Sequence, residues 1–334
     1  MKFNRIFLAL MLLEISLSSC LISDQTGSIK VEVMKPGIFS IPDSIRKVAI
    51  LTRYKLQSDT FKTGYIDDIR IITDTNIKYQ DLKYKCADAT AEFITEYGNF
   101  DQVKNYGDSL NFIFNKSIPQ LSSEDILEEV NADMCIILDS FHLRNELITN
   151  ENGIFFNSEP SLRWIVTYKN DQNFYCYNQH DTLTFNTDDF NLYNLKKGRL
   201  KAVLDRCAQI EGEYFGTKLI PTWTTVDRLY YKSKNQKMQL AMQLALKNDW
   251  ESAAKIWNIE AKSKNKNIAT KAKFNMALVC EMEGRPDLGI GWLTKSYNEF
   301  EGNDIVHKAN CQRYINVLAI RQKDIAKLEK QMKY

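Results

Sequence analysis

The residue types that most often carry catalysis or bind metal ions are few and scattered in this chain of 334 residues. Its three histidines, His142, His180 and His307, are far apart in the sequence, so a catalytic triad or a metal site would depend on the fold. The acidic pairs Asp67-Asp68 and Asp188-Asp189 could serve acid/base chemistry or bind Ca²⁺, but the spacing of an EF-hand is missing. No glycine-rich phosphate loop and no GxSxG motif occurs. We therefore expect a protein that is not an enzyme and that has no catalytic residues, no metal ligands and no cofactor.

One cysteine stands in a context with a defined chemistry. Leu17-Ser18-Ser19-Cys20 follows a short apolar segment over residues 6–13, which Lys2 and Arg5 precede, an order typical of a secretory signal. These four residues resemble the lipobox of bacterial lipoproteins, in which the thiol is diacylated and the preceding residues are removed. The apolar segment is too short to span a bilayer, which takes about 20 residues. The sequence thus predicts a signal peptide over residues 1–19 and an acylated Cys20 that binds the membrane.

Six cysteines remain after Cys20, and none has a neighbour at a spacing that suits zinc binding or redox catalysis. An exported protein could pair some of them in disulfides. Cys135 falls in a strand-like run and Cys280 in a helix-like run, which favours buried free thiols. If a disulfide forms, we expect Cys280 to pair with Cys311.

Charge is distributed unevenly along the chain after the signal peptide. Residues 20–231 carry 23 Lys and Arg against 30 Asp and Glu, whereas residues 232–334 carry 19 against 11. Opposite signs on two segments indicate two modules. The basic segment is either a surface for an acidic partner or lipid headgroups, or a set of solvated helix faces attracted to the other module.

Apolar runs and helical periodicity predict alternating strands and helices in the first two thirds of the chain. The predicted strands cover residues 29–34, 47–52, 100–106, 134–140, 162–168 and 174–177, and the predicted helices cover residues 81–97, 126–130 and 195–215. This order predicts an α/β domain with a mixed sheet over residues 31–218, preceded by a polar tether over residues 20–30.

From residue 235 to the end, the pattern is helical. The segment around Leu240 superposes on the segment around Met276 at an offset of 36 residues, which resembles tetratricopeptide repeats, and residues 304–334 would cap them. The predicted fold class is therefore an α/β domain followed by an all-α tetratricopeptide-like repeat domain over residues 235–334, with chance helical hairpins as the alternative. The residues expected to pack the repeat are Leu240, Ala241, Leu244, Ala253, Trp257, Met276, Ala277, Cys280, Gly284, Gly289 and Leu293.

Residues 219–234 indicate a connector with a composition enriched at interfaces, which either packs between the modules or binds a partner or glycan. Its candidate residues are Pro221, Trp223, Arg228, Tyr230 and Tyr231. On the repeat, the cations that could meet an acidic peptide are Lys237, Lys247, Lys255, Lys271 and Lys273.

Two family resemblances rest on these segments. The first likeness lies in residues 47–52 and 162–168, and above all in Leu219-Ile220-Pro221-Thr222-Trp223 with Arg228-Leu229-Tyr230-Tyr231. These segments resemble an uncharacterised family of bacterial envelope lipoproteins that joins an α/β domain to tetratricopeptide-like helices. The α/β part is similar, more distantly, to the periplasmic domain of the curli-secretion lipoprotein.

The lipobox, the repeat pattern and the lack of a catalytic motif predict a non-enzymatic, lipid-anchored scaffold that binds envelope proteins through its repeats. Because Leu21-Ile22-Ser23-Asp24 has no acidic run next to Cys20, we expect it at the outer membrane, facing the periplasm. The alternatives are an accessory subunit of a secretion or surface-assembly system and an enzyme with a site that no motif reveals. Because the chain is exported, we expect no nucleic-acid partner.

Overall fold

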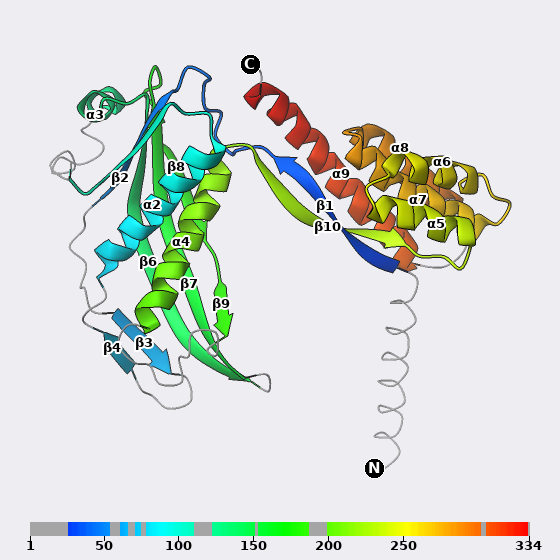
Figure 1. Cartoon of the computed structure of the whole chain (residues 1–334), viewed down its shortest axis with the longest axis horizontal. Helices are drawn as coiled ribbons and strands as arrows, with labels where there is room; N and C mark the ends of the chain where they lie inside the picture. Colours follow the sequence, from blue (N-terminus) through cyan, green and yellow to red (C-terminus); the bar gives the residue numbers. More distant parts are fainter. Residues whose placement is uncertain are drawn as a thin grey trace, which may run out of the picture. The chain divides into compact units, whose positions relative to one another are not determined.

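The chain divides into two compact units, and the division does not follow chain order. The computed structural model describes residues 26–53, 61–65, 71–74, 78–109, 122–150, 153–186, 199–301 and 305–332. One unit, here the helical unit, joins the described residues up to Lys35 with Trp223–Lys333, and the other, the sheet unit, holds Pro36–Thr222 (Figure 1).

The predicted fold class is wrong for the C-terminal part of the chain. Strands β1 (Thr26–Lys35) and β10 (Thr222–Tyr231) form a two-stranded sheet. Ile29, Val31 and Val33 of β1 are buried in the same core as the C-terminal helices, so that unit is not all-α and strands occur in both units. Residues 26–30, predicted as tether, and most of the predicted connector are therefore strand.

After β10, the described residues of the helical unit form five helices. They are α5 (Gln236–Leu246), α6 (Trp250–Glu260), α7 (Lys266–Met282), α8 (Pro286–Glu299) and α9 (Ile305–Gln331). Each packs against the next along the chain. The turns between α5 and α6 and between α7 and α8 use left-handed residues, Asn248 with φ 62° and Gly284 with φ 70°, which lie 36 positions apart. The 36-residue offset between the two similar segments thus corresponds to two helical hairpins whose turns both contain a left-handed residue.

The sheet unit is built on a curled mixed sheet, with eight strands in the described residues. They are β2 (Lys47–Thr52), β3 (Phe61–Tyr65), β4 (Ile71–Asp74), β5 (Gln102–Gly107), β6 (Met134–Asn150), β7 (Gly153–Tyr168), β8 (Tyr175–His180) and β9 (Leu183–Asn186). β2 is parallel to β5 on one side and to β6 on the other, and β6 is antiparallel to β7. β6 and β7 extend beyond their predicted bounds because they form one long hairpin, with pairing from Met134 with Tyr168 to Asn150 with Gly153.

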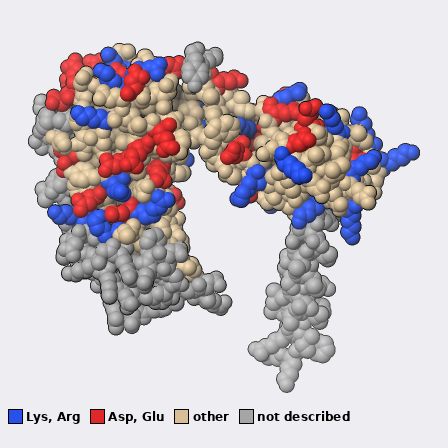
Figure 2. Space-filling view, viewed as in Figure 1, with Lys and Arg blue, Asp and Glu red and all other residues tan. Residues whose placement is uncertain are grey.

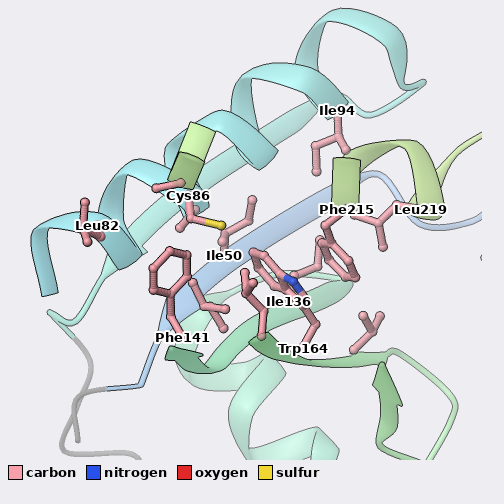
Figure 3. Packing of buried hydrophobic residues seen from close by; sticks show 14 of the residues in the cluster. Ile50, Leu82, Cys86, Ile94, Ile136, Phe141, Trp164, Phe215 and Leu219 are labelled. Atoms are coloured by element: carbon pink, nitrogen blue, oxygen red, sulfur yellow. The ribbon is translucent and has the colours of Figure 1, made fainter. Parts of the chain in front are cut away.

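Helices α2 (Tyr79–Tyr97) and α4 (Arg199–Leu219) pack on one face of this sheet, and α3 (Ser123–Val130) packs on the other. In the core under α2 and α4, the ring of Phe215 stacks on Trp164 with 4.1 Å between centroids (Figure 3). Ser122 caps the N-terminus of α3, because its hydroxyl accepts a hydrogen bond from the Asp125 amide and the Asp125 carboxylate accepts one from the Ser122 amide. None of the helices in the described ranges is both long and apolar enough to cross a membrane.

Close packing of α2 on α4 depends on Gly212. A Cβ atom there would lie 2.1 Å from the Cys86 carbonyl oxygen, and the Thr90 hydroxyl donates to the Gly212 carbonyl at 3.0 Å. We expect Gly212→Ala to lower the free energy of unfolding by about 1 to 3 kcal/mol, because the two backbones must separate. Gly291→Ala, in α8 with nothing within 4 Å of its Cβ, is the matched control and should stabilise by up to about 1 kcal/mol. Denaturant titration of both variants checks this, and a Gly212→Ala protein as stable as the parent would contradict it.

Candidate functional site

Several residues singled out from the sequence lie outside the described residues. They include Cys20 with the signal peptide over residues 1–19, and the acidic pairs Asp67-Asp68 and Asp188-Asp189. The candidate sites that follow are therefore those of the two described units.

Arg228 of β10 forms a buried ion pair with Glu281 of α7. Its Nε lies 2.8 Å from Glu281 Oε2 and its Nη2 lies 2.7 Å from Oε1, and the Tyr314 hydroxyl of α9 donates to Oε2 at 2.7 Å. The Glu281 side chain is fully buried and that of Arg228 is 14% exposed. Burial, followed by the charge of Glu281, raises the pKa of Tyr314 well above its usual value. This network joins the predicted connector to two helices.

Tyr231 is fixed at the end of the same strand by two asparagine side chains. Its amide donates to Asn275 Oδ1 at 2.8 Å, and Asn275 Nδ2 donates to its carbonyl at 3.0 Å. Asn310 Nδ2 donates to the Tyr231 hydroxyl at 3.0 Å. By contrast, Trp223 at the start of the strand is 65% exposed, while Pro221 and Tyr230 are half-buried. The connector residues are thus divided between the core and the surface, and they do not form one site.

The residues predicted to pack the repeat are also divided. Leu240 is 50% exposed and Gly284 is an exposed turn residue, so neither belongs to the packed core, and Leu244 is half-buried. The buried ones are Ala241, Ala253, Trp257, Met276, Ala277, Cys280, Gly289 and Leu293.

Leu240 lies on an open side of α5, the first helix in the stack. Leu246 on the same helix is 57% exposed. Gln243, Lys237 and Lys247 are exposed on the same helix, and with these leucines they cover about half of its circumference. These five residues are here called the α5 face. Two half-exposed leucines flanked by lysines are a composition that suits an apolar and acidic partner segment.

The five lysines predicted to meet a partner do not share one surface. Lys237, Lys247 and Lys255 are exposed, although Lys255 lies 2.7 Å from Glu251 in an ion pair and Lys237 lies 3.6 Å from Glu260 in another. Lys271 is half-buried, with its ammonium 5.8 Å from the centroid of the Tyr231 ring. The prediction for Lys273 is wrong, because it is buried in an ion pair with Glu299.

In the sheet unit, Glu211 of α4 is buried against Gln179 of β8. Gln179 Nε2 donates to Glu211 Oε2 at 2.5 Å and to the Glu211 carbonyl at 3.0 Å. Burial raises the pKa of Glu211 to about 7, while the hydrogen bond from Gln179 opposes this and the charge of Asp181 adds to it. Within the described residues, Oε1 of Glu211 and Oε1 of Gln179 have no hydrogen-bond partner. A proton on Glu211 would turn one of its carboxyl oxygens into a hydrogen-bond donor.

The histidines and cysteines do not form a reactive site in the described part of the chain. His142 and His180 are exposed, whereas His307 is buried with Nε2 3.1 Å from Ser296 Oγ and 3.5 Å from Cys311 Sγ. Burial raises the pKa of Cys311 to about 11, so its thiol stays protonated at neutral pH. The six described cysteines are free, and five are buried. No group of three His, Cys, Asp or Glu in these ranges could hold a metal ion.

Comparisons with known proteins name no activity. Residues 45–231 match a family described as a domain of unknown function (DUF8603), and residues 239–320 match another domain of unknown function (DUF6340). No curated protein matches the chain. The solved structure of the hypothetical protein CT253 from Chlamydia trachomatis is similar over 51% of this chain and 98% of its own, with 9% identity and a TM-score of 0.26.

Proposed function

The chain belongs to the family described as domain of unknown function DUF8603, and on that premise we propose a function from its own residues: a non-enzymatic envelope lipoprotein, anchored through acylated Cys20, that binds another envelope protein through the α5 face. The anchor holds it at the outer membrane, facing the periplasm. The observation that carries the binding role is the exposure of Leu240 and Leu246 on the terminal helix of the stack.

The two leucines support a binding role because the exposed half of each side chain gains nothing from folding of the isolated chain and can be covered by a partner. A fully buried leucine contributes about 1.5 to 3 kcal/mol relative to an exposed one, so covering both would favour association. Lys237 and Lys247 lie at the two ends of the helix and would select an acidic partner and its register. We therefore expect the partner to present an apolar helix or extended segment with acidic flanks.

Photo-crosslinking in intact cells tests this role. A photo-crosslinking amino acid in place of Gln243, in the middle of the α5 face, should give a covalent adduct with another envelope protein. The same amino acid in place of Lys323, exposed on α9, is the control and should give none. Equal adducts at both positions, or none at position 243, would refute the proposed face. An adduct with a subunit of a secretion channel would instead favour the alternative role in secretion or surface assembly.

Removing the two leucines should abolish the adduct without unfolding the protein. We expect Leu240→Ser with Leu246→Ser to reduce the adduct at position 243 at least about tenfold, because partial burial of two leucines exceeds the 1.4 kcal/mol of a tenfold change. Ile320→Ser, at a 61% exposed position of α9, is the matched control and should leave the yield unchanged. Adduct yield and melting temperature are measured together, and a double variant that cross-links like the parent would count against the proposal.

A further inference from the structure

The proposed anchor at Cys20 is connected directly to the helical unit. Only residues 21–25 separate Cys20 from β1, which begins at Thr26 and pairs with β10 in the helical unit. Five residues reach at most about 18 Å when fully extended. If Cys20 is acylated, as the proposed function holds, the start of β1 stays within that distance of the bilayer surface.

The unit held there is the basic one. By sequence, residues 26–35 and 223–333 carry 22 Lys and Arg against 13 Asp and Glu, whereas residues 36–222 carry 20 against 27. Lys and Arg side chains are visible over the surface of the helical unit in Figure 2. Attraction to anionic lipids acts only within about a Debye length, roughly 8 Å at physiological ionic strength, so the placement of single cations near the anchor matters.

Three cations lie at the end of the helical unit where β1 begins. A Cβ atom at Gly27 would lie 2.5 Å from the Tyr230 ring, so the first residues of β1 lie beside the last residues of β10, which Lys232 and Lys234 follow. Both lysines are exposed. The Tyr231 and His307 rings lie 5.1 Å apart between centroids, so the start of α9, with Lys308, is at the same end. No ion pair between described residues involves these three lysines, although Lys266 and Glu301 pair nearby at 3.8 Å.

An exposed apolar side chain lies on α9 three residues before Lys308, which is half-buried with its ammonium 5.3 Å from the centroid of the Tyr297 ring. Ile305, the first residue of α9, is 81% exposed, the largest exposure among the large hydrophobic residues of the described part. Cations next to an exposed apolar side chain are the composition with which proteins lie on a bilayer interface: the charges meet headgroups and the apolar group enters the acyl boundary. Lys232, Lys234, Ile305 and Lys308 are here called the β1-end surface.

We infer that the β1-end surface docks on anionic phospholipid headgroups, with Ile305 entering the interface. Docking adds a second contact to the lipid anchor and fixes the orientation of the helical unit on the bilayer. The inference rests on the proposed anchor, and the two can be tested separately in one preparation.

In the test protein, Cys176→Ser removes the exposed cysteine and Ile305→Cys carries an environment-sensitive fluorophore. This lipidated full chain is reconstituted on vesicles of phosphatidylcholine with or without phosphatidylglycerol. We expect access of an aqueous quencher to position 305 to fall at least about fivefold on the anionic vesicles only. The control is a second protein that keeps Cys176 and Ile305 and carries the label on Cys176, the exposed cysteine among the described ones, where access should be equal on both kinds of vesicle. Absence of co-flotation with vesicles would overturn the anchor and this inference with it. Co-flotation with position 305 fully accessible on anionic vesicles would overturn this inference alone.

Charge reversal separates docking from general attraction. A triple variant with Lys232→Glu, Lys234→Glu and Lys308→Glu should restore quenching at position 305, while co-flotation with the vesicles persists. The control is a second triple variant, with Lys247→Glu, Lys323→Glu and Lys330→Glu, which makes the same charge change at exposed positions away from the β1 end. It should leave position 305 protected from the quencher. Equal loss of protection in both triple variants would show that only net charge matters and would refute the β1-end surface.

Discussion

Arg228→Met is expected to lower the free energy of unfolding by about 3 to 5 kcal/mol. The substitution leaves the fully buried Glu281 carboxylate without the guanidinium that it contacts at 2.7 and 2.8 Å, and an uncompensated buried charge carries a penalty of that size. The Tyr314 hydroxyl remains as a hydrogen-bond donor but does not neutralise the charge. Denaturant unfolding followed by tryptophan fluorescence measures the loss, since Trp257 is buried in the same unit.

Two further variants isolate the cause. Arg228→Met combined with Glu281→Met removes both charges and should regain most of the lost stability, because the pair is then replaced by apolar groups. Lys255→Met breaks an exposed ion pair with Glu251 and should change stability by no more than about 0.5 kcal/mol. If Arg228→Met has no greater effect than Lys255→Met, the ion pair does not hold β10 to the helices.

Strand β10 shows why the sequence predicts local elements better than their partners. The strand over residues 47–52 has a continuous apolar run at residues 48–51, and its predicted bounds agree with the observed ones, because such a run is typical of a strand buried on both faces. β10 has no such pattern: Trp223 and Leu229 are exposed, whereas Arg228 is largely buried. Its partner β1 lies about 190 residues away in the sequence. Without a visible period or a nearby partner, the sequence there indicates a connector, and the all-α prediction for the C-terminal part is wrong.

The polar residues of the core were missed for a related reason. Asn275 and Glu211 lie in helices, where a polar residue normally marks the solvated face. Their partners, the Tyr231 backbone and Gln179, come from strands that are distant in the sequence. Lys273 was assigned to an exposed binding surface by the same assumption, and its burial against Glu299 contradicts that. Helical periodicity identifies the apolar face, but the pairing of a buried polar group is a property of the tertiary fold.

Glu211 is expected to make the sheet unit less stable as the pH rises from about 4.5 to about 7. Burial raises its pKa in the folded chain to about 7 from the usual 4.5, so the folded state binds the proton more tightly than the unfolded state. The stabilising contribution is complete below pH 4.5, is lost progressively up to about pH 7 and stays lost above it. A pKa difference of about 2.5 units corresponds to roughly 3 kcal/mol between the two limits.

Glu211→Gln should remove this pH dependence while keeping the contact with Gln179. The amide of the variant has the shape of the carboxylic acid and offers a donor for the otherwise unpartnered Gln179 Oε1, so the variant should exceed the parent by about 3 kcal/mol at pH 8 and match it near pH 4.5. Glu213→Gln, two residues further on in a partly exposed ion pair with Arg206, is the matched control and should follow the parent. Denaturant titrations at pH 4.5, 6 and 8 compare the three proteins. Parallel curves for the parent and Glu211→Gln would mean that the carboxyl group is already ionised in the folded chain and that the orphaned oxygens find their partners in water.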